Sequence, residues 1–183
     1  MNGSSVGLLE LTSVAAGFAV ADAMLKAANV RLLLSRSICS GKFMILIGGD
    51  AAAVASAVAT GTVAAAGCLI DQTVLSNLHP DVLEAIGRPG TGEASGALGI
   101  VESFNVATLV EAADAAVKAA TVTLLELRLA MALGGKAFAV FTGDVASVQS
   151  AVDAAKRVLA EAGVLVNAVV LARPHPGVYR ELV

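Results

Sequence analysis

Two cysteines are the residues of this 183-residue chain best suited to redox or metal chemistry. Cys39 lies in a short polar stretch (residues 37–42, SICSGK), whereas Cys68 lies at the start of an apolar run. Neither belongs to a Cys-x-x-Cys pair, and a soft metal ion or an iron–sulfur cluster needs several thiolates. One chain alone therefore offers no complete metal site. A lone cysteine is more often a small core residue than a ligand, and we interpret Cys68 in that way.

The remaining motifs do not combine into a catalytic site. The Gly-Lys pairs that begin at Gly41 and Gly135 lack both the earlier glycine and the following Ser or Thr of a phosphate-binding loop. His79 and His175 each precede a proline at matching places, which favours a structural role in a turn. No Ser-His-Asp set and no pair of carboxylates in a cleft can be placed. We expect a protein that is not an enzyme.

The elements that position these residues form a duplicated unit. Residues 6–10 (VGLLE) recur as residues 98–102 (LGIVE), and residues 21–30 recur as residues 113–122. A Gly-Asp pair and a His-Pro pair also occur once in each copy. A glycine-rich stretch separates the copies and has the composition of a flexible linker. The predicted organisation is a first domain over 1–87, a linker over 88–96 and a second domain over 97–183.

Each copy predicts the same order of elements, β-α-β-β-α-β. In the second copy, Val106, Leu109, Val110, Ala113 and Val117 follow the helical period. An aspartate in each Gly-Asp pair can cap the second helix of its copy. The fold class is therefore α+β, with two tandem ferredoxin-like domains whose helices lie on one face of the sheet. The first copy predicts strands at 6–11, 30–38, 43–47 and 68–75, a first helix at 14–28 and a second helix after Asp50.

Composition excludes several classes of function. With 12 Lys and Arg against 15 Asp and Glu, the net charge of −3 provides no basic field for nucleic acid or for anionic membranes. Two cysteines cannot form a disulfide scaffold, and no leader pattern opens the sequence, so we expect a cytoplasmic protein. Residues 51–70 carry no charge and have the length of a membrane span. The second copy of this segment is charged, so we expect no membrane insertion.

The repeated pattern resembles the shell domain of bacterial microcompartments, the BMC domain. The resemblance rests on Gly-x-x-Glu, Ala-Asp-Ala-Met-x-Lys-x-Ala-x-Val, Gly-Asp-Val and Pro-His-x-x-Val, and it covers nearly the whole chain. Two fused copies are similar to the tandem-domain shell proteins, in the type whose copies are not permuted. This resemblance implies a homotrimeric pseudohexamer that tiles with itself and with other shell proteins.

The resemblance also implies which residues face neighbours and which line a central pore. Lys26 and Lys118 correspond to the edge lysine of the family, although a lysine at a helix C-terminus is also stabilised by the helix dipole alone. Arg173 corresponds to the edge arginine, and the first copy has Asn77 in its place. The implied pore-loop positions are Ser37, Ile38, Ser40, Gly41, Met131, Ala132, Leu133 and Gly134.

In the type of shell protein that the chain resembles, a cysteine of this loop is taken to hold a [4Fe–4S] cluster, and Cys39 occupies the matching position. Three chains would bring three thiols to one axis, for electron transfer across the shell or for exchange of the cluster. An encapsulated redox enzyme is then a possible partner. One alternative is an open pore for small polar metabolites with no cluster. Another is a soluble ferredoxin-like oligomer that binds a small ligand between subunits.

Overall fold

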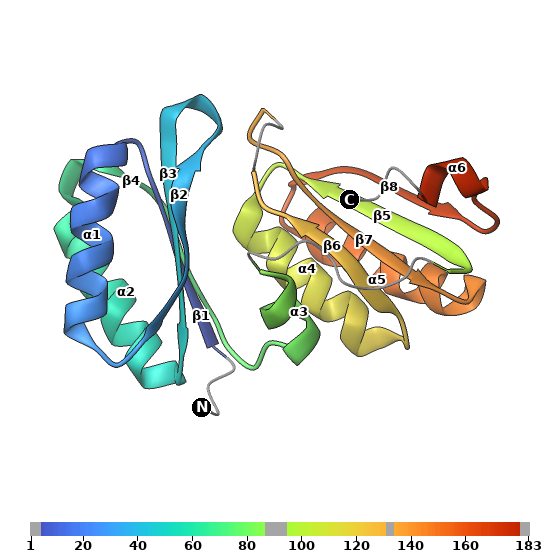
Figure 1. Cartoon of the computed structure of the whole chain (residues 1–183), viewed down its shortest axis with the longest axis horizontal. Helices are drawn as coiled ribbons and strands as arrows, with labels where there is room; N and C mark the ends of the chain where they lie inside the picture. The colour runs from blue at the N-terminus through green and yellow to red at the C-terminus, as the bar shows by residue number, and fades with distance from the viewer. Residues whose placement is uncertain (1–4, 87–94, 131–133, 180–183) are drawn as a thin grey trace. The chain divides into compact units, whose positions relative to one another are not determined.

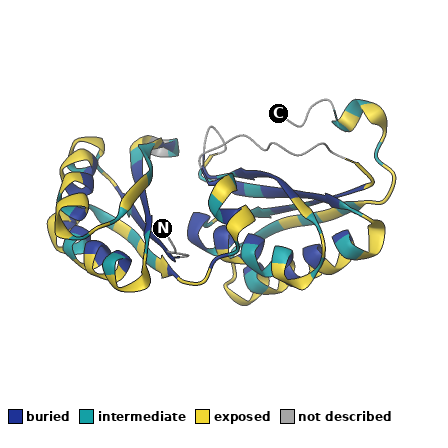
Figure 2. Ribbon diagram, turned by 60° about the horizontal axis from the view of Figure 1, so that its bottom comes forward, coloured by how far each residue is buried: buried dark blue, intermediate teal, exposed yellow. Residues whose placement is uncertain are grey.

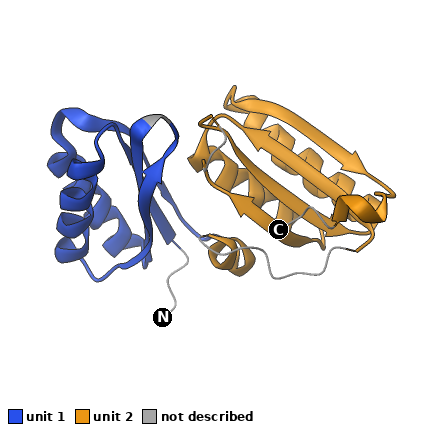
Figure 3. Cartoon of the chain, turned by 45° about the horizontal axis from the view of Figure 1, so that its top comes forward, with its two compact units in different colours: residues 1–78 blue, residues 79–183 orange. Residues whose placement is uncertain are grey.

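The computed structural model describes residues 5–86, 95–130 and 134–179, with the side chain of Ser40 left out. The chain divides into two compact units, Met1–Leu78 and His79–Val183 (Figure 3). Each unit is described by itself below. The linker predicted at 88–96 lies mostly outside the described residues.

The first unit has the predicted order β-α-β-β-α-β (Figure 1). Short 3-10 turns, η1 and η2, precede its third and fourth strands. Its elements are β1 (Ser5–Leu11), α1 (Val14–Ala27), β2 (Arg31–Ile38), η1 (Cys39–Gly41), β3 (Lys42–Gly49), α2 (Ala51–Ala65), η2 (Ala66–Cys68) and β4 (Leu69–Leu75).

The second unit repeats this order, with an additional short helix before it and another after it. The helix before it, α3, follows the first His-Pro pair, and the helix after it, α6, follows the second. The elements are α3 (Pro80–Ala85), β5 (Ala97–Ser103), α4 (Val106–Ala119), β6 (Thr123–Arg128), β7 (Ala137–Gly143), α5 (Val145–Glu161), β8 (Leu165–Leu171) and α6 (Pro176–Tyr179).

Both sheets are antiparallel and have equivalent strand orders, β2-β3-β1-β4 and β6-β7-β5-β8. Leu8 lies opposite Leu46 in the first, as Ile100 lies opposite Val140 in the second. Two helices cover one face of each sheet, α1 and α2 in the first unit and α4 and α5 in the second (Figures 1 and 3). The ferredoxin-like α+β prediction is therefore confirmed for both copies.

The helices pack close to the sheets because small residues lie between them. A Cβ atom at Gly7 would come within 2.5 Å of Val58 Cγ2, and one at Gly99 would come within 2.5 Å of Val152 Cγ2. Figure 2 shows that the buried residues of the helices gather on the sides facing the sheet. A core cluster of the first unit includes Leu9, Phe43 and Met24, all of them almost fully buried. This core is made of aliphatic layers with little aromatic bulk.

Aspartates cap the second helix of each unit, as predicted. Asp50 Oδ1 accepts a hydrogen bond from the backbone N–H of Ala53 at 2.9 Å, and Asp144 Oδ1 accepts one from Ser147 at 2.9 Å. Among the described residues, the helical stretch Ala51–Cys68 is long and apolar enough to cross a membrane by length and composition. Its buried residues, Val54 and Val58 among them, pack in the core of the first unit.

Candidate functional site

The turn between β2 and β3 carries Cys39. Ile38 pairs with Lys42 across its base, and η1 fills the turn between them. Gly41 has φ +73°, and no atom lies within 4 Å of the place a Cβ would occupy. Glycine accepts this left-handed conformation without strain. Figure 1 shows the hairpin of β2 and β3 extending past the helices at one end of the unit.

Cys39 and Cys68 lie in different surroundings. Cys68 packs against the core of the first unit, and its Sγ donates a hydrogen bond to the carbonyl oxygen of Ala65 at 2.7 Å. Cys39 is half-buried and is the first residue of η1 in the projecting turn. Neither cysteine forms a disulfide. Cys68 was predicted to be a core residue. It packs against the core but is only half-buried, because it ends η2 just before β4 begins.

The thiol of Cys39 is a suitable ligand for a soft metal or an iron–sulfur cluster. One chain, however, offers too few ligands to hold such a group. Within the described part of the chain, no three His, Cys, Asp or Glu side chains come together as ligands. An iron–sulfur cluster is held by several cysteine thiolates. The residues therefore fit such a group only where several copies of the turn meet.

An ion pair that the sequence motifs did not predict fixes the base of each turn. Lys42 Nζ lies 3.1 Å from Glu10 Oε1, and Lys136 Nζ lies 3.5 Å from Glu102 Oε2. In each pair the glutamate comes from the first strand of the unit. Lys42 is the first residue of β3, and Lys136 directly precedes β7. The sequence signal was available, because both the glutamate and the Gly-Lys pair recur at equivalent places in the two copies.

The corresponding turn of the second unit carries no cysteine. Leu129 and Ala130 are buried, Ala130 has φ +52°, and Gly134 and Gly135 have φ of +63° and +89°. Three of the predicted pore-loop positions, Met131, Ala132 and Leu133, lie outside the described residues, as does the side chain of Ser40. The two turns of a chain therefore differ in both sequence and backbone.

An arginine precedes Cys39 on β2 in a setting unlike that of its counterpart. Arg128 in the second unit pairs with Glu126 at 2.5 Å and lies over the ring of Phe138 at 5.4 Å. Leu34 stands where Glu126 would be, so Arg36 lacks that carboxylate. Burial lowers the pKa of Arg36 from its usual value, because desolvation disfavours the charged form. A cationic side chain is thus held partly buried on the strand that leads to Cys39.

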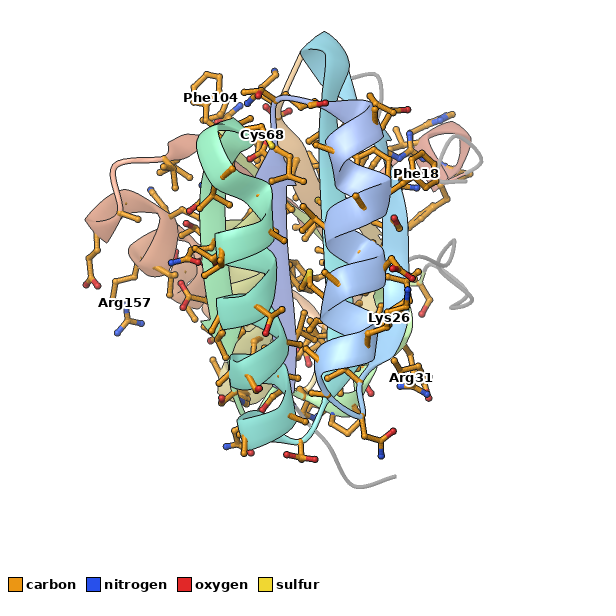
Figure 4. All side chains as sticks on the ribbon, turned by 90° about the vertical axis from the view of Figure 1, so that its left-hand side faces the viewer. Phe18, Lys26, Arg31, Cys68, Phe104 and Arg157 are labelled. Carbon is orange, nitrogen blue, oxygen red and sulfur yellow. The ribbon has the colours of Figure 1, made fainter. Side chains whose placement is uncertain are left out.

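The predicted edge lysines lie in the last turns of the first helices. Lys26 Nζ is 2.5 Å from Asp22 Oδ2, and Lys118 Nζ is 2.5 Å from Asp114 Oδ2. The lysine of the first unit is the more exposed, at 75% against 41% for its counterpart. Such i,i+4 pairs are readable from sequence. Figure 4 shows Lys26 along the side of α1 that lies away from α2.

The predicted edge residue Lys26 and the turn that carries Cys39 lie at opposite ends of β2. Lys26 is followed within a few residues by Arg31, the first residue of β2, whereas Cys39 follows its last residue. An extended strand of this length spans roughly 23 Å. Arg173 is exposed in the segment between β8 and α6 of the second unit. The structure therefore keeps the predicted edge and pore residues of the first unit apart.

The histidines have the structural role that the sequence predicts. His79 Nδ1 accepts a hydrogen bond from the backbone N–H of Asp81 at 3.3 Å, and His175 Nδ1 accepts one from Gly177 at 3.1 Å. Each ring therefore caps the short helix that follows its His-Pro pair. This duplicated contact gives the histidines a conformational function.

These elements define a class of protein: a tandem repeat of a small antiparallel domain with a projecting turn and charged helix ends. The BMC domain matches residues 5–78 and 97–174, and the chain belongs to the family of BMC-domain proteins. It is a shell protein of bacterial microcompartments, which are protein shells in the cytoplasm. The resemblance seen in the sequence is confirmed.

The particular relatives point to one type within this family. The chain is 47% identical over 179 residues to the bacterial microcompartment shell protein PduT of Citrobacter freundii, which covers 98% of this chain and 97% of that protein. A crystal structure of a microcompartment protein from Desulfitobacterium hafniense superposes with a TM-score of 0.91 at 48% identity, over 96% of this chain and 98% of that one. The protein is thus a PduT-like shell protein.

More distant relatives are also shell proteins. EutM of Salmonella typhimurium is 40% identical over 79 residues, 43% of this chain and 80% of that protein. A fused permuted hexameric shell protein from the RMM microcompartment shares the fold, with a TM-score of 0.61 at 22% identity over 85% of this chain and 81% of that one. These relatives are structural proteins, so the expectation that the chain is not an enzyme is confirmed by kinship.

Proposed function

We propose that three copies of this chain form a shell tile with a [4Fe–4S] cluster on the threefold axis, held by one Cys39 thiolate from each copy. The observation that carries the proposal is the position of Cys39, at the start of the projecting β2–β3 turn and outside the core cluster that holds Cys68. The cysteine belongs to one copy of the repeat, so a trimer supplies three such thiols.

Three thiolates match the needs of such a cluster. A [4Fe–4S] cluster is commonly held by four cysteines, so three leave one iron open to water or to an external ligand. When bound, the cluster supplies a one-electron couple that moves charge across the shell, and its open position also permits exchange of the whole cluster. The proposed function therefore transports either electrons or whole clusters across the shell.

Several residues of the chain would support the bound group. The ion pair between Lys42 and Glu10 holds the base of the turn and so limits the motion of Cys39. Backbone N–H groups of the turn, near Gly41, can donate to sulfur, and such hydrogen bonds tune the potential of a cluster. The positive charge of Arg36 on the preceding strand favours an anionic group nearby.

Tiling into a shell facet is the second part of the proposal. Lys26 and Lys118 would lie at the tile edge, where each contacts a neighbouring tile, and Arg173 would add a contact from the second copy only. The side chain of Lys26 is 75% exposed, so its ammonium group is accessible to a neighbouring tile although it is paired with Asp22. The partners are other shell proteins and, on the inner side, a redox enzyme.

A second candidate function is an open pore. Gly41 has free space around its Cα, and Ser37 is exposed at the end of β2, so the turn has the small polar character of a channel lining. In that case Cys39 lines a hole for polar metabolites. A soluble oligomer that binds a ligand between subunits is disfavoured by the family.

Iron and acid-labile sulfide per trimer, measured after anaerobic reconstitution, test the cluster. We expect about four of each, a brown colour, and a spin-active reduced state that are all lost in Cys39→Ser. Cys68→Ser is the matched control and should retain the cluster, because its hydroxyl can keep the hydrogen bond to Ala65. A colourless trimer with three titratable Cys39 thiols would leave the open pore as the function.

A further inference from the structure

The strand that leads into the projecting turn carries an arginine close to Cys39 (Figure 1 shows β2 and the turn). Arg36 lies on β2, with two residues between it and Cys39. At the rise of an extended strand, this separation is at most roughly 10 Å between the two Cα atoms. That distance is about one Debye length at physiological ionic strength, so salt screens the charge only in part. Arg36 is therefore near enough to act on a charge bound at the turn.

Arg36 is held in apolar surroundings. It lies opposite Met44 of β3, which is almost fully buried. Leu34, two residues earlier on β2, lies on the same face of the sheet. Desolvation in this setting lowers the pKa of Arg36 from its usual value, although an arginine stays charged at neutral pH. Because charges interact more strongly where water is excluded, this cation acts further than one on an open surface.

The second unit provides a carboxylate to the equivalent arginine. Arg128 Nη2 lies 2.5 Å from Glu126 Oε1, and the guanidinium lies 5.4 Å from the centre of the Phe138 ring. The first unit has Leu34 and Met44 at these two positions. The copy that carries the cysteine is thus the copy whose arginine has no carboxylate at this neighbouring position on its own strand.

Charged side chains near the turn on this face of the first sheet also include Glu10, Lys42 and Asp71. Lys42 and Glu10 pair with each other at 3.1 Å, so their charges compensate. Asp71 lies opposite Glu10 on β4, which is three strands from β2 in the order β2-β3-β1-β4. At about 4.8 Å per strand, Asp71 is roughly 14 Å from Arg36 across the sheet. Arg36 is the positive charge on the strand that ends at the cysteine.

We infer that Arg36 sets the reduction potential of the cluster proposed at Cys39, by stabilising its reduced state. The inference rests on the proposed function and concerns the regulation of that same site. A [4Fe–4S] group on three thiolates is anionic overall and gains one more negative charge when it takes up an electron. No bond forms or breaks at the arginine. A cation nearby favours the reduced state and so raises the potential, and three chains supply three such cations.

Two substitutions remove the effect of the charge in different ways. Arg36→Gln deletes the cation. Leu34→Glu keeps it and rebuilds in the first unit the pair that Glu126 makes with Arg128 in the second, so the variant should fold. We expect both to lower the midpoint potential of the reconstituted trimer, so that the ratio of reduced to oxidised cluster at a fixed potential falls about tenfold. The measurement is a titration with dithionite and mediator dyes, followed by electron paramagnetic resonance.

Three control variants separate the charge of Arg36 from its shape and from total charge. Arg36→Lys keeps the positive charge and should stay near the wild-type potential. Leu34→Gln introduces a polar side chain without charge and should do the same. Arg31→Gln removes an arginine from the first residue of the same strand. That residue lies roughly 23 Å from the end of β2 at the turn, more than two Debye lengths away, so its loss should leave the potential unchanged.

The outcomes distinguish this inference from the proposed function. Wild-type potentials in cluster-loaded Arg36→Gln and Leu34→Glu would overturn the inference and leave the cluster standing. An equal shift in Arg31→Gln would also overturn it, because the effect would then follow total charge. If Arg36→Gln does not retain iron, the comparison of Leu34→Glu with Leu34→Gln decides the question. A wild-type trimer that binds no iron would overturn both the inference and the proposed cluster.

Discussion

Lys42 Nζ lies 3.1 Å from Glu10 Oε1, which ties the start of β3 to the first strand directly below the turn that holds Cys39. Side chains alternate between the two faces of a strand. Gly7 and Leu9 face the helices, so Glu10 lies on the opposite face of the sheet. The turn is thus braced on the face without helices, and its equivalent in the second unit is braced in the same way.

Removal of this brace should loosen the turn without unfolding the unit. For Glu10→Gln we expect a loss of about 0.2–1 kcal/mol in the free energy of unfolding, because the pair is partly exposed. In the proposed holo trimer, iron should also be lost faster to a chelator. Glu102→Gln is the control, since it affects the turn without a cysteine, and it should leave iron release unchanged. Equal release rates in both variants would contradict a role of this pair in holding Cys39.

The glycines under the helices should not tolerate a methyl group. Gly7→Ala places a Cβ within 2.5 Å of Val58 Cγ2, and Gly99→Ala does the same against Val152. Overpacking of this kind costs about 1–3 kcal/mol, measurable by urea denaturation. Gly67→Ala, where no atom lies within 4 Å of the added Cβ, should be close to neutral. A Gly7→Ala protein as stable as the wild type would show that α2 can move away from the sheet.

The cap at Asp144 should contribute stability that depends on pH. Hydrogen bonds from the Ser147 side chain and backbone lower the pKa of Asp144. A lowered pKa in the folded state means that the stabilisation is present at neutral pH and is lost as the pH falls below about 4, the usual pKa of aspartate, toward the folded value. Asp144→Ala should therefore have a lower urea midpoint than the wild type at pH 7, and the difference should shrink in acid. A difference that is independent of pH would refute this account.

The edge lysine should matter for tiling and not for folding. In Lys26→Ala we expect trimers of normal stability, because exposed i,i+4 pairs contribute only about 0.3–0.5 kcal/mol, together with loss of extended sheets in electron micrographs. Lys156→Ala, an exposed lysine on α5, should still form sheets. Normal sheets from Lys26→Ala would remove this residue from the proposed edge.

Local patterns predicted most of the fold. The helical spacing of Val110 and Val117, the Asp50 cap and the repeat itself were sufficient for the order of elements, because each depends on residues close in sequence or on direct comparison of the copies. The packing of α3 on α4 and β6 was not predicted, since the hydrogen bond from the backbone N–H of His79 to Asp114 Oδ1 joins residues 35 positions apart. The brace between Glu10 and Lys42 depends on strand register, which the sequence does not give directly.

The covalent fusion has a consequence for stoichiometry. Because each chain carries both copies, the proposed ring of six domains needs three chains to meet instead of six, and the linker keeps each pair of copies at a high effective concentration. Fusion also frees the two copies to diverge. A ring of six identical domains would carry six thiols around its centre or none, whereas alternating copies, one with Cys39 and one with Met131 at the matching position, allow an odd count that a single-domain tile cannot reach.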